Sequence, residues 1–352
     1  MRTRSQPLSH VPMLPRSRKL RMNNKRILIH KLSNGAMAKT FALAALCMMA
    51  TMLVGCGWMV EEDAKKIVVP APQPHRMMHT RVDQNAKMIA EGKITSFGRA
   101  KAPDGTEIAY WIIRHRSAAT SSAETRGTAL LIHPLLTDCE WFLDVGQKLA
   151  DRNWDVVLVD LRAHGQSGGD YVTWGAKEKY DLKAVMDKLL AQQAVSDKIY
   201  AFGASLGGCV AIQYGAIDER CRGVVSVCPP ASVRDVARRI LFMCSERDLD
   251  ARLKRAGELA KFDISDASAV EAAKKLRCPL ILVHGEWDMV VPYQHSEIIF
   301  NAAPPPKMLI PLPWSNHFTA QVWRDDWLVQ QIEAVAQLAT TTQPATVTPA
   351  AE

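Results

Sequence analysis

The chain has 352 residues, of which 48% are hydrophobic and 23% are charged, so it is long enough to bury a sizeable core. Its formal charge is +8, but the first 60 residues hold ten Lys and Arg and no Asp or Glu. The rest of the chain therefore carries a formal charge of −2. Because this body is nearly neutral, the charge distribution argues against binding of nucleic acid.

The basic N-terminal segment ends in a pattern typical of an export signal. From Met37 a short basic start is followed by an apolar stretch, Phe41 to Val54, and by small residues before Cys56. This pattern resembles a bacterial lipoprotein signal peptide. The resemblance implies that residues 1–56 are a leader, that Cys56 is acylated, and that the protein is exported and anchored to a membrane of the cell envelope. The apolar stretch is short for a membrane-spanning helix, which is the alternative, and a start at Met37 rather than Met1 gives a signal of ordinary length.

The cysteines of the body give no metal pattern. They form neither a CxxC pair nor a Cys/His spacing typical of zinc, so we expect no structural metal. Export permits disulfides, but the pairing cannot be read from the sequence, and buried free thiols are the alternative. The six residues are Cys139, Cys209, Cys221, Cys228, Cys244 and Cys278.

Composition sets the limits of the folded body. Residues 57–85 include the proline-rich stretch 68–74 and are expected to form a tether. Residues 339–352 are mostly Thr, Ala, Pro and Gln and are expected to form a disordered tail. The domain is therefore predicted to span 86–338.

Short apolar runs alternate with longer helical patterns in this body, which predicts a parallel sheet covered by helices on both faces. The first two runs, Ile94 to Phe97 and Glu107 to Arg114, are expected to pair antiparallel. Six buried strands are then predicted at Ala129 to Ile132, Val156 to Val159, Ile199 to Phe202, Gly223 to Val227, Leu280 to Val283 and Met308 to Ile310. Helices are predicted at 141–152, 176–193, 206–216 and 325–338.

Residues 230–277 interrupt the alternation with charged helical patterns, as a small cap insertion would. In an open α/β sheet such an insertion lies over the carboxyl ends of the strands, where ligands bind. Its many arginines indicate either a solvated face or a clamp for an anionic substrate.

The segment with the clearest chemistry follows the strand that ends at Phe202. Gly203, Ser205 and Gly207 form a G-x-S-x-G turn between that strand and a helix. The two glycines leave room where side chains would collide with the neighbouring strand and helix. The turn also places Ser205 at the amino end of the helix, where developing negative charge is stabilised.

Three further motifs follow the order of the α/β-hydrolase superfamily, and with the serine turn they make the chain resemble it over about 92–337. They are Asp160-Leu-Arg-Ala-His-Gly-Gln-Ser167, Leu280-Ile-Leu-Val-His-Gly-Glu-Trp-Asp288 and Trp314-Ser-Asn-His317. The resemblance implies an α/β-hydrolase fold, that is, a mostly parallel eight-stranded sheet with helices on both faces and a small helical insertion. It also implies a Ser, Asp, His order of catalytic residues.

Each predicted catalytic residue has a chemical role. Ser205 is the expected nucleophile, His317 the general base, and Asp288 the acid that orients and stabilises the imidazole. Glu286 is a rival carboxylate on the same loop, but the family's spacing from Gly285 selects Asp288. His164 and His284 are interpreted as scaffold, and His295, at the start of a predicted helix, as not catalytic.

An oxyanion hole needs two backbone donors. The Leu206 N–H, next to the nucleophile, is expected to be one. By resemblance the other belongs to the loop after the strand that ends at Ile132, where Pro134 replaces the family's usual glycine. Proline has no N–H, so the donor is expected to be Leu135.

The sequence thus predicts a serine hydrolase that cleaves a carboxylic ester through an acyl-enzyme on Ser205, with no cofactor or metal. Thioester or amide cleavage and acyl transfer use the same residues, and a catalytically silent, membrane-tethered binding module is a further alternative. The small insertion predicts small or medium acyl substrates.

Overall fold

The computed structural model describes residues 59–70, 81–115, 125–321 and 325–341. The chain divides into residues 1–57 and a compact unit from residue 58 to the C-terminus, and all described residues belong to the second unit. The predicted leader with Cys56 therefore lies outside the described residues. Within the described ranges, no helix has both the length and the apolar character needed to cross a membrane.

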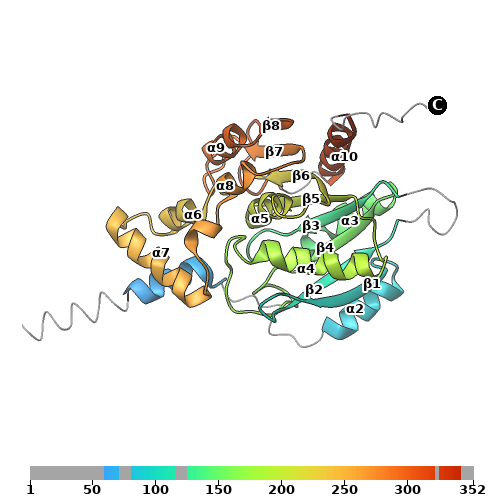
Figure 1. The fold of residues 1–352 in the computed structure, drawn as a ribbon, viewed down its shortest axis with the longest axis horizontal. Helices are drawn as coiled ribbons and strands as arrows, with labels where there is room; N and C mark the ends of the chain where they lie inside the picture. Colours follow the sequence, from blue (N-terminus) through green and yellow to red (C-terminus); the bar gives the residue numbers. More distant parts are fainter. Residues whose placement is uncertain (1–58, 71–80, 116–124, 322–324, 342–352) are drawn as a thin grey trace, which may run out of the picture. The chain divides into compact units, whose positions relative to one another are not determined.

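An eight-stranded sheet forms the centre of this unit (Figure 1), in the order β1-β2-β4-β3-β5-β6-β7-β8. β2 pairs antiparallel with both β1 and β4, and the remaining neighbours are parallel. The predicted antiparallel opening pair and six further strands are confirmed. The strands are β1 (Ser96–Lys101), β2 (Glu107–Ile113), β3 (Thr128–Ile132), β4 (Asp155–Val159), β5 (Ile199–Ala204), β6 (Cys221–Val227), β7 (Leu280–Gly285) and β8 (Lys307–Leu312).

The central strands are apolar along their whole length because both faces of the sheet are covered. Every residue of β3, β4, β5 and β7 is buried. Side chains alternate between the faces, so Leu130 and Ile132 of β3 join one core cluster while Ala129 and Leu131 join the other.

Helices cover the two faces. α4, α5, α8 and α9 pack on the cluster that contains Leu130, whereas α3 and α10 pack on the cluster that contains Leu131. The four helices predicted from periodicity are confirmed as α3, α4, α5 and α10. Besides a helix over 59–68, the described residues form nine helices and two 3-10 turns. These are α2 (Arg81–Ala90), η3 (Cys139–Phe142), α3 (Leu143–Ala150), α4 (Glu178–Ala191), α5 (Leu206–Gly215), α6 (Val233–Ile240), α7 (Glu246–Ala260), η4 (Ile264–Asp266), α8 (Ala269–Ala273), α9 (Gln294–Ala302) and α10 (Asp325–Thr341).

The span 230–277 is helical, as its pattern indicated, and contains α6, α7 and α8. Each of these helices begins after a serine whose side chain accepts a hydrogen bond from a backbone N–H three residues later. The serines are Ser232, Ser245 and Ser268. Local capping thus places the helix starts within an otherwise charged segment.

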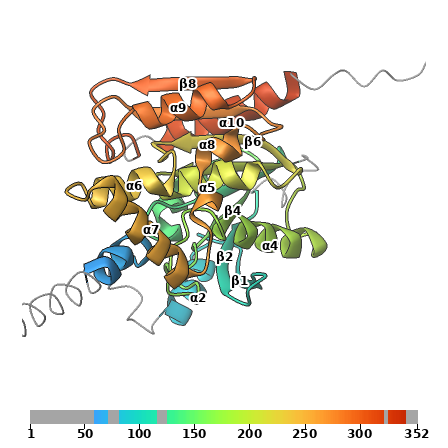
Figure 2. The same cartoon turned by 60° about the vertical axis from the view of Figure 1, so that its left-hand side comes forward.

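The expected tether over 57–85 is wrong for two of its parts. Residues 59–68 are helical, and Ala64, Ile67 and Val68 are buried in the core. Figures 1 and 2 show this helix (blue) beside α7. Its acidic residues form ion pairs with α7, and its apolar residues are buried. The proline content alone therefore gave the wrong prediction for this segment. α2 also starts within the span, at Arg81.

Two smaller expectations concern the tail and the cysteines. α10 continues through Thr341, with Ala339 buried, so the tail does not begin at residue 339, and 342–352 lie outside the described residues. The six cysteines of the described part are free thiols, and all but Cys244 are buried.

Candidate active site

The turn between β5 and α5 holds Ser205 in a strained backbone conformation, with φ 52° and ψ −117°. Its N–H donates to the Val227 carbonyl at 2.8 Å. A Cβ on Gly203 would lie 2.1 Å from the Gly207 carbonyl oxygen, and a Cβ on Gly207 would lie 2.1 Å from the Ile132 carbonyl oxygen. Both glycines are therefore sterically required at this turn.

Three side chains from separate loops meet at this turn. The Nε2 atom of His317 lies 3.0 Å from Ser205 Oγ, and its Nδ1 atom lies 2.6 Å from Asp288 Oδ2. Asp288 follows β7, and His317 follows β8, while Glu286 is exposed on the same loop as Asp288. The structure thus brings together the three residues predicted as nucleophile, base and acid, and their catalytic roles stay a prediction.

The Asp288 carboxylate is held in its ionised form. Burial opposes ionisation, but hydrogen bonds from His284, His317 and the Val291 N–H outweigh it and keep the pKa of Asp288 well below its usual range. Oδ1 accepts from the N–H groups of Val290 and Val291 at 2.9 and 2.7 Å. An anion in this position favours the His317 tautomer that carries its proton on Nδ1.

His284, interpreted from sequence as scaffold, supports the acid loop directly. Its Nε2 atom lies 2.8 Å from the Val291 carbonyl and 3.4 Å from Asp288 Oδ2. Its Nδ1 atom lies 2.6 Å from Ser296 Oγ. Its position at the end of β7, four residues before Asp288, was the only sequence signal for this role.

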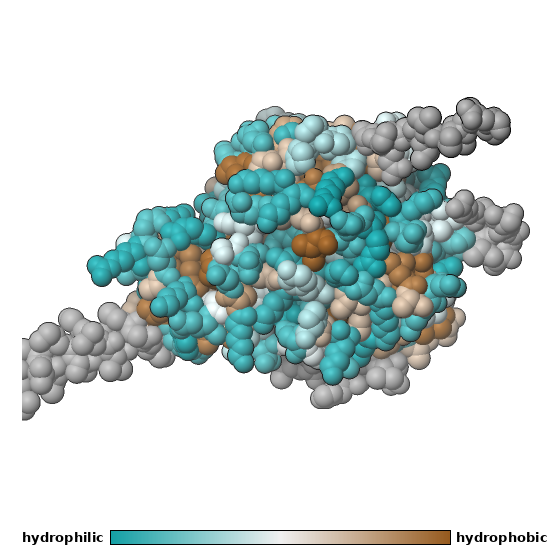
Figure 3. All heavy atoms as spheres, in the orientation of Figure 1, coloured by the Kyte–Doolittle hydropathy of each residue, from teal (hydrophilic) through white to brown (hydrophobic). Residues whose placement is uncertain are grey.

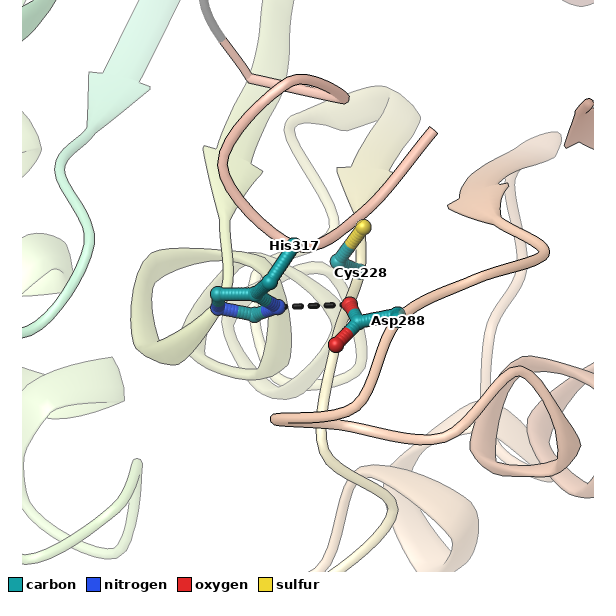
Figure 4. A group of neighbouring side chains, drawn as sticks. All are labelled: Cys228, Asp288 and His317. Carbon is teal, nitrogen blue, oxygen red and sulfur yellow. Dashed lines mark hydrogen bonds and ion pairs between the residues drawn. The ribbon is translucent and has the colours of Figure 1, made fainter. Parts of the chain in front are cut away.

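Cys228 is a residue of the site that sequence reasoning missed. It follows β6 with φ 49°, is fully buried, and shares a cluster with Asp288 and His317 in which potential ligand atoms lie within 4.8 Å of one another (Figure 4). Burial and the nearby Asp288 charge raise the pKa of the Cys228 thiol. Because a soft metal needs the thiolate and His317 already bonds Asp288, this cluster fits a hydrogen-bonded arrangement better than a metal site.

The predicted oxyanion donors are available. Within the described part of the chain, neither the Leu135 N–H nor the Leu206 N–H has a hydrogen-bond partner. Leu206 is the first residue of α5, and Leu135 lines the same cavity as Ser205. Pro134 therefore leaves the expected donor beside it free.

The Pro134 carbonyl fixes the direction of the Leu135 N–H. It lies 2.7 Å from His133 Nδ1 and accepts a hydrogen bond from Thr137 Oγ1 at 2.8 Å. In a trans peptide the N–H points opposite to the C=O, so these contacts orient the Leu135 N–H away from them. Burial and the neighbouring His164 lower the pKa of His133 to about 3, so the ring is neutral.

The segment from Asp160 to Ser167 forms the structural turn that its motif predicted, and it also contacts the oxyanion loop. Gly165 has φ 48°, and a Cβ there would lie 1.9 Å from Asp160 Oδ2. The Leu136 N–H donates to His164 Nε2 at 3.3 Å. His164 therefore holds the residue after the predicted donor.

A mostly apolar cavity of 170 Å³ opens onto Ser205. The cap insertion supplies part of its wall through α6, and the loop after β7 supplies another part. Its lining residues are Leu135, Trp174, Ser205, Pro230, Asp235, Val236, Arg239, Ile240, Val290, Val291, Pro292 and His295. A larger cavity of 520 Å³, lined by Asp218, Cys221 and Arg277 among others, holds none of the three candidate catalytic residues.

His295 lines this cavity rather than contacting Ser205. Its Nδ1 atom accepts a hydrogen bond from the Ala231 N–H at 3.2 Å. Burial lowers the pKa of His295. The ring is therefore a neutral part of the wall, which agrees with its interpretation as a non-catalytic histidine.

Comparison with known proteins adds family and fold information. A family model described as "Serine aminopeptidase, S33" matches residues 123–254, which include Ser205 and end before Asp288. The uncharacterized protein YfhR of Escherichia coli K12 is 25% identical over 222 residues, which are 62% of this chain and 72% of that protein. The uncharacterized protein YqkD of Bacillus subtilis is 22% identical over 204 residues, 53% of this chain and 63% of that protein.

Solved structures resemble the chain more widely. The esterase Pf2001 of Pyrococcus furiosus has a TM-score of 0.56 and 21% identity, covering 71% of this chain and 95% of its own. Est1E of Butyrivibrio proteoclasticus, with ferulic acid bound, has a TM-score of 0.55 and 17% identity, covering 69% of this chain and all of its own. The chain has the α/β-hydrolase fold, and its family match supports an activity of the serine-hydrolase type.

Proposed function

We propose that the protein hydrolyses carboxylic esters through an acyl-enzyme on Ser205. The observation that carries the proposal is the continuous hydrogen-bonded line from Ser205 Oγ through His317 to Asp288, with distances of 3.0 and 2.6 Å. It stands beside two free backbone donors at Leu135 and Leu206. Nucleophile, base, orienting acid and oxyanion donors are the parts that acyl transfer requires.

In the first half of the reaction, Ser205 attacks the ester carbonyl while His317 Nε2 takes the hydroxyl proton. The carbonyl oxygen becomes an oxyanion that accepts hydrogen bonds from Leu135 and Leu206. When the tetrahedral intermediate collapses, the C–O bond to the alcohol breaks and His317 returns its proton to the departing oxygen. The acyl group is then bonded to Ser205 Oγ.

The second half repeats these steps with water. His317 removes a proton from water as the water oxygen attacks the acyl carbon, and the same two donors hold the new oxyanion. Collapse breaks the bond to Ser205 Oγ, which takes the proton from His317 and releases a carboxylic acid. Asp288 remains ionised throughout and stabilises the imidazolium that forms twice.

The cavity supports small or medium acyl groups. A volume of 170 Å³ with apolar walls suits a short hydrocarbon chain, and the few polar groups at Asp235, Arg239 and His295 interrupt the wall. Solved relatives of the same fold include esterases, which supports the ester as the bond cleaved.

Amide cleavage is a second candidate because the matching family is described as a serine aminopeptidase. The same residues attack amides, but an amine is a poorer leaving group than an alcohol and depends more on protonation by His317. Rates on matched esters and anilides of one short acyl group separate the two proposals.

Labelling with a fluorophosphonate probe tests the activity itself. The probe phosphonylates an activated serine, so we expect labelling of the parent protein and none of Ser205→Ala. The variant Ser265→Ala, at an exposed serine of η4 outside the cavity lining, is a control for reaction at other serines. A folded parent protein that resists the probe would favour a catalytically silent binding module.

We also propose that Cys56 carries a lipid that anchors the protein at the cell envelope. The sequence pattern before Cys56 supports this. Radiolabelled palmitate should be incorporated into the parent protein and not into Cys56→Ala, and the variant should leave the membrane fraction. Equal membrane retention of the two proteins would exclude this anchor.

A further inference from the structure

The most exposed apolar side chains of the described residues occur on the cap and on the loops that carry Asp288 and His317. Among the described residues, eight large hydrophobic side chains are more than half exposed. Six of them lie on the loops and the cap next to the cavity, with exposed fractions of 58% to 86%. We name these six the apolar rim: Phe242, Met243, Trp287, Met289, Trp314 and Phe318.

One ring contact joins two members of the apolar rim, and two further contacts connect the rim to α6 and to His317. The rings of Trp287 and Trp314 meet edge to face with centroids 4.8 Å apart. Arg239 of α6 donates to the Met289 carbonyl at 2.5 Å, which connects the cap to the loop after β7. Phe318 follows His317, and their ring centroids lie 5.8 Å apart. Four members of the rim therefore lie on the loops that carry Asp288 and His317, and the other two directly follow α6, which lines the cavity at Ser205.

One face of the protein offers a contrast. The face drawn in Figure 3 is mostly hydrophilic, and hydrophobic residues occur there in small, separate areas. Scattered apolar residues are normal on a soluble surface, but a contiguous group of aromatic and methionine side chains marks an interaction site. Tryptophan is favoured where an apolar phase meets water, since its ring is apolar and its N–H is polar.

The N-terminal helix shows which end of the unit is nearest the proposed anchor. Residues 59–68 are bound to α7 through ion pairs of Asp63 with Arg252 and Glu61 with Arg255, at 2.8 and 2.5 Å. In Figures 1 and 2 this helix lies at the same side as α6 and α7. Three peptide units separate Cys56 from Met59, and they span at most about 11 Å when fully extended.

We infer that the apolar rim is a docking surface for a lipid bilayer, which brings the cavity of Ser205 to the membrane. The orientation of the protein on the membrane rests on the proposed anchor at Cys56. The assignment of the rim as a docking surface rests on the composition and exposure of its side chains. Arg239 lies at its edge, where lipid phosphates can meet it. The small cavity then accepts a short acyl group, while the remainder of a membrane-resident substrate stays at the lipid surface.

The test separates the rim from the anchor. All proteins carry Cys56→Ala and Trp58→Phe, which remove the acylation site and the tryptophan beside it. They are mixed with vesicles of phosphatidylcholine, with or without an anionic lipid, whose acyl chains are brominated and quench tryptophan at short range. The rim variant adds Phe242→Ser and Met243→Ser, which keeps Trp287 and Trp314 as the reporters of contact with the lipid. The control adds Ile298→Ser, an exposed apolar residue of α9.

We expect quenching by the vesicles in the background protein and in the control, and its loss in the rim variant. Vesicle affinity should fall about ten-fold or more, as expected when two large apolar side chains no longer leave water. Equal quenching in the rim variant overturns the inference. So does a rim-dependent dimer, seen by light scattering, that forms without vesicles and is not quenched by them.

Fluorophosphonate labelling of the same proteins distinguishes this inference from the proposed activity. The rim variant should label at the rate of the control, which also shows that it is folded. Labelling without rim-dependent vesicle binding excludes the docking surface and leaves the proposed hydrolase activity standing. Rim-dependent binding without labelling excludes the proposed hydrolase activity and leaves the docking surface standing.

Discussion

Asp288 is the residue whose electrostatics are most clearly defined, because its carboxylate accepts hydrogen bonds from both sides. Oδ1 is bound by two backbone N–H groups and Oδ2 by His317. These contacts explain why an acid with 4% exposure stays ionised. The carboxylate is thus a source of stability as well as an orienting group.

The pH dependence of stability follows from this lowered pKa. An unfolded aspartate titrates near ~3.9, and the folded Asp288 titrates below that value. Its stabilising contribution is therefore complete above about pH 4 and is lost as the pH falls below it. Urea unfolding should show a difference in free energy of unfolding between parent and Asp288→Asn that is steady near neutrality and shrinks in acid. A difference that grows on acidification would contradict the assignment.

Thr137 acts indirectly: its hydroxyl donates a hydrogen bond to the Pro134 carbonyl and so helps to orient the Leu135 N–H. Thr137→Val removes one of the two hydrogen bonds that orient the Leu135 N–H, worth about 1 kcal/mol. We expect kcat to fall about five-fold with KM little changed, and affinity for a boronic acid transition-state analogue to fall in parallel.

The control for this effect is Thr137→Ser, which keeps the hydroxyl and should restore kcat. If Thr137→Val raises KM and leaves analogue affinity unchanged, the residue only supports the loop and does not orient the oxyanion donor.

At the scale of elements, α6 determines how much room an acyl group finds beside Ser205. It lines the cavity with Asp235, Val236, Arg239 and Ile240. A helix in the cap can change this wall without disturbing the sheet, because loops and insertions carry specificity on a fixed scaffold.

A series of nitrophenyl esters of increasing acyl length tests whether α6 sets the acyl specificity. The parent should hydrolyse esters of short acyl groups, from acetyl through butanoyl, faster than long-chain esters. Val236→Ala should shift this preference toward longer chains by enlarging the cavity. Val270→Ala, the same change on α8 outside the cavity lining, should leave the preference unchanged. A parent rate that rises through the longest chains would refute the small acyl site.

At the scale of the whole molecule, the helix over 59–68 is part of the folded unit. Asp63 and Arg252 form an ion pair in which the two side chains are 14% and 9% exposed. Trp174, which lines the active-site cavity, also donates through Nε1 to the Ile67 carbonyl at 2.8 Å. The N-terminal helix thus connects the cap with the wall of the site.

Breaking this pair should be costly because it leaves a nearly buried guanidinium without its partner. We expect Asp63→Asn to lower the free energy of unfolding by about 2 kcal/mol. Glu271→Gln, which breaks an exposed pair with Lys274, should cost less than about 0.5 kcal/mol. Equal effects in urea unfolding would show that the helix is only loosely attached.

Much of the molecule could be predicted from local signals. The strands could be predicted because β3, β4, β5 and β7 are buried on both faces of the sheet and are therefore almost entirely apolar. The turn at Ser205 was readable because Gly203 and Gly207 are the residues that its close backbone contacts require. The spacing of Asp288 from Gly285 was enough to prefer it over Glu286, which the structure leaves exposed.

Other features depend on contacts between distant parts of the chain, which no local pattern contains. The helix over 59–68 is held by α7, almost two hundred residues later, and the proline-rich stretch that follows it gave no sign of that contact. Cys228, His284 and Thr137 contact or orient site residues only after their strands and loops come together. The sequence by itself determined the covered parallel sheet and the turn at Ser205, because these depend on periodicity and steric limits, and its resemblance to the α/β-hydrolase superfamily supplied the chain order that selects Asp288 and His317. Only the tertiary structure decided which groups support Asp288 and Leu135 and which side chains line the cavity at Ser205, because those depend on where separate elements meet.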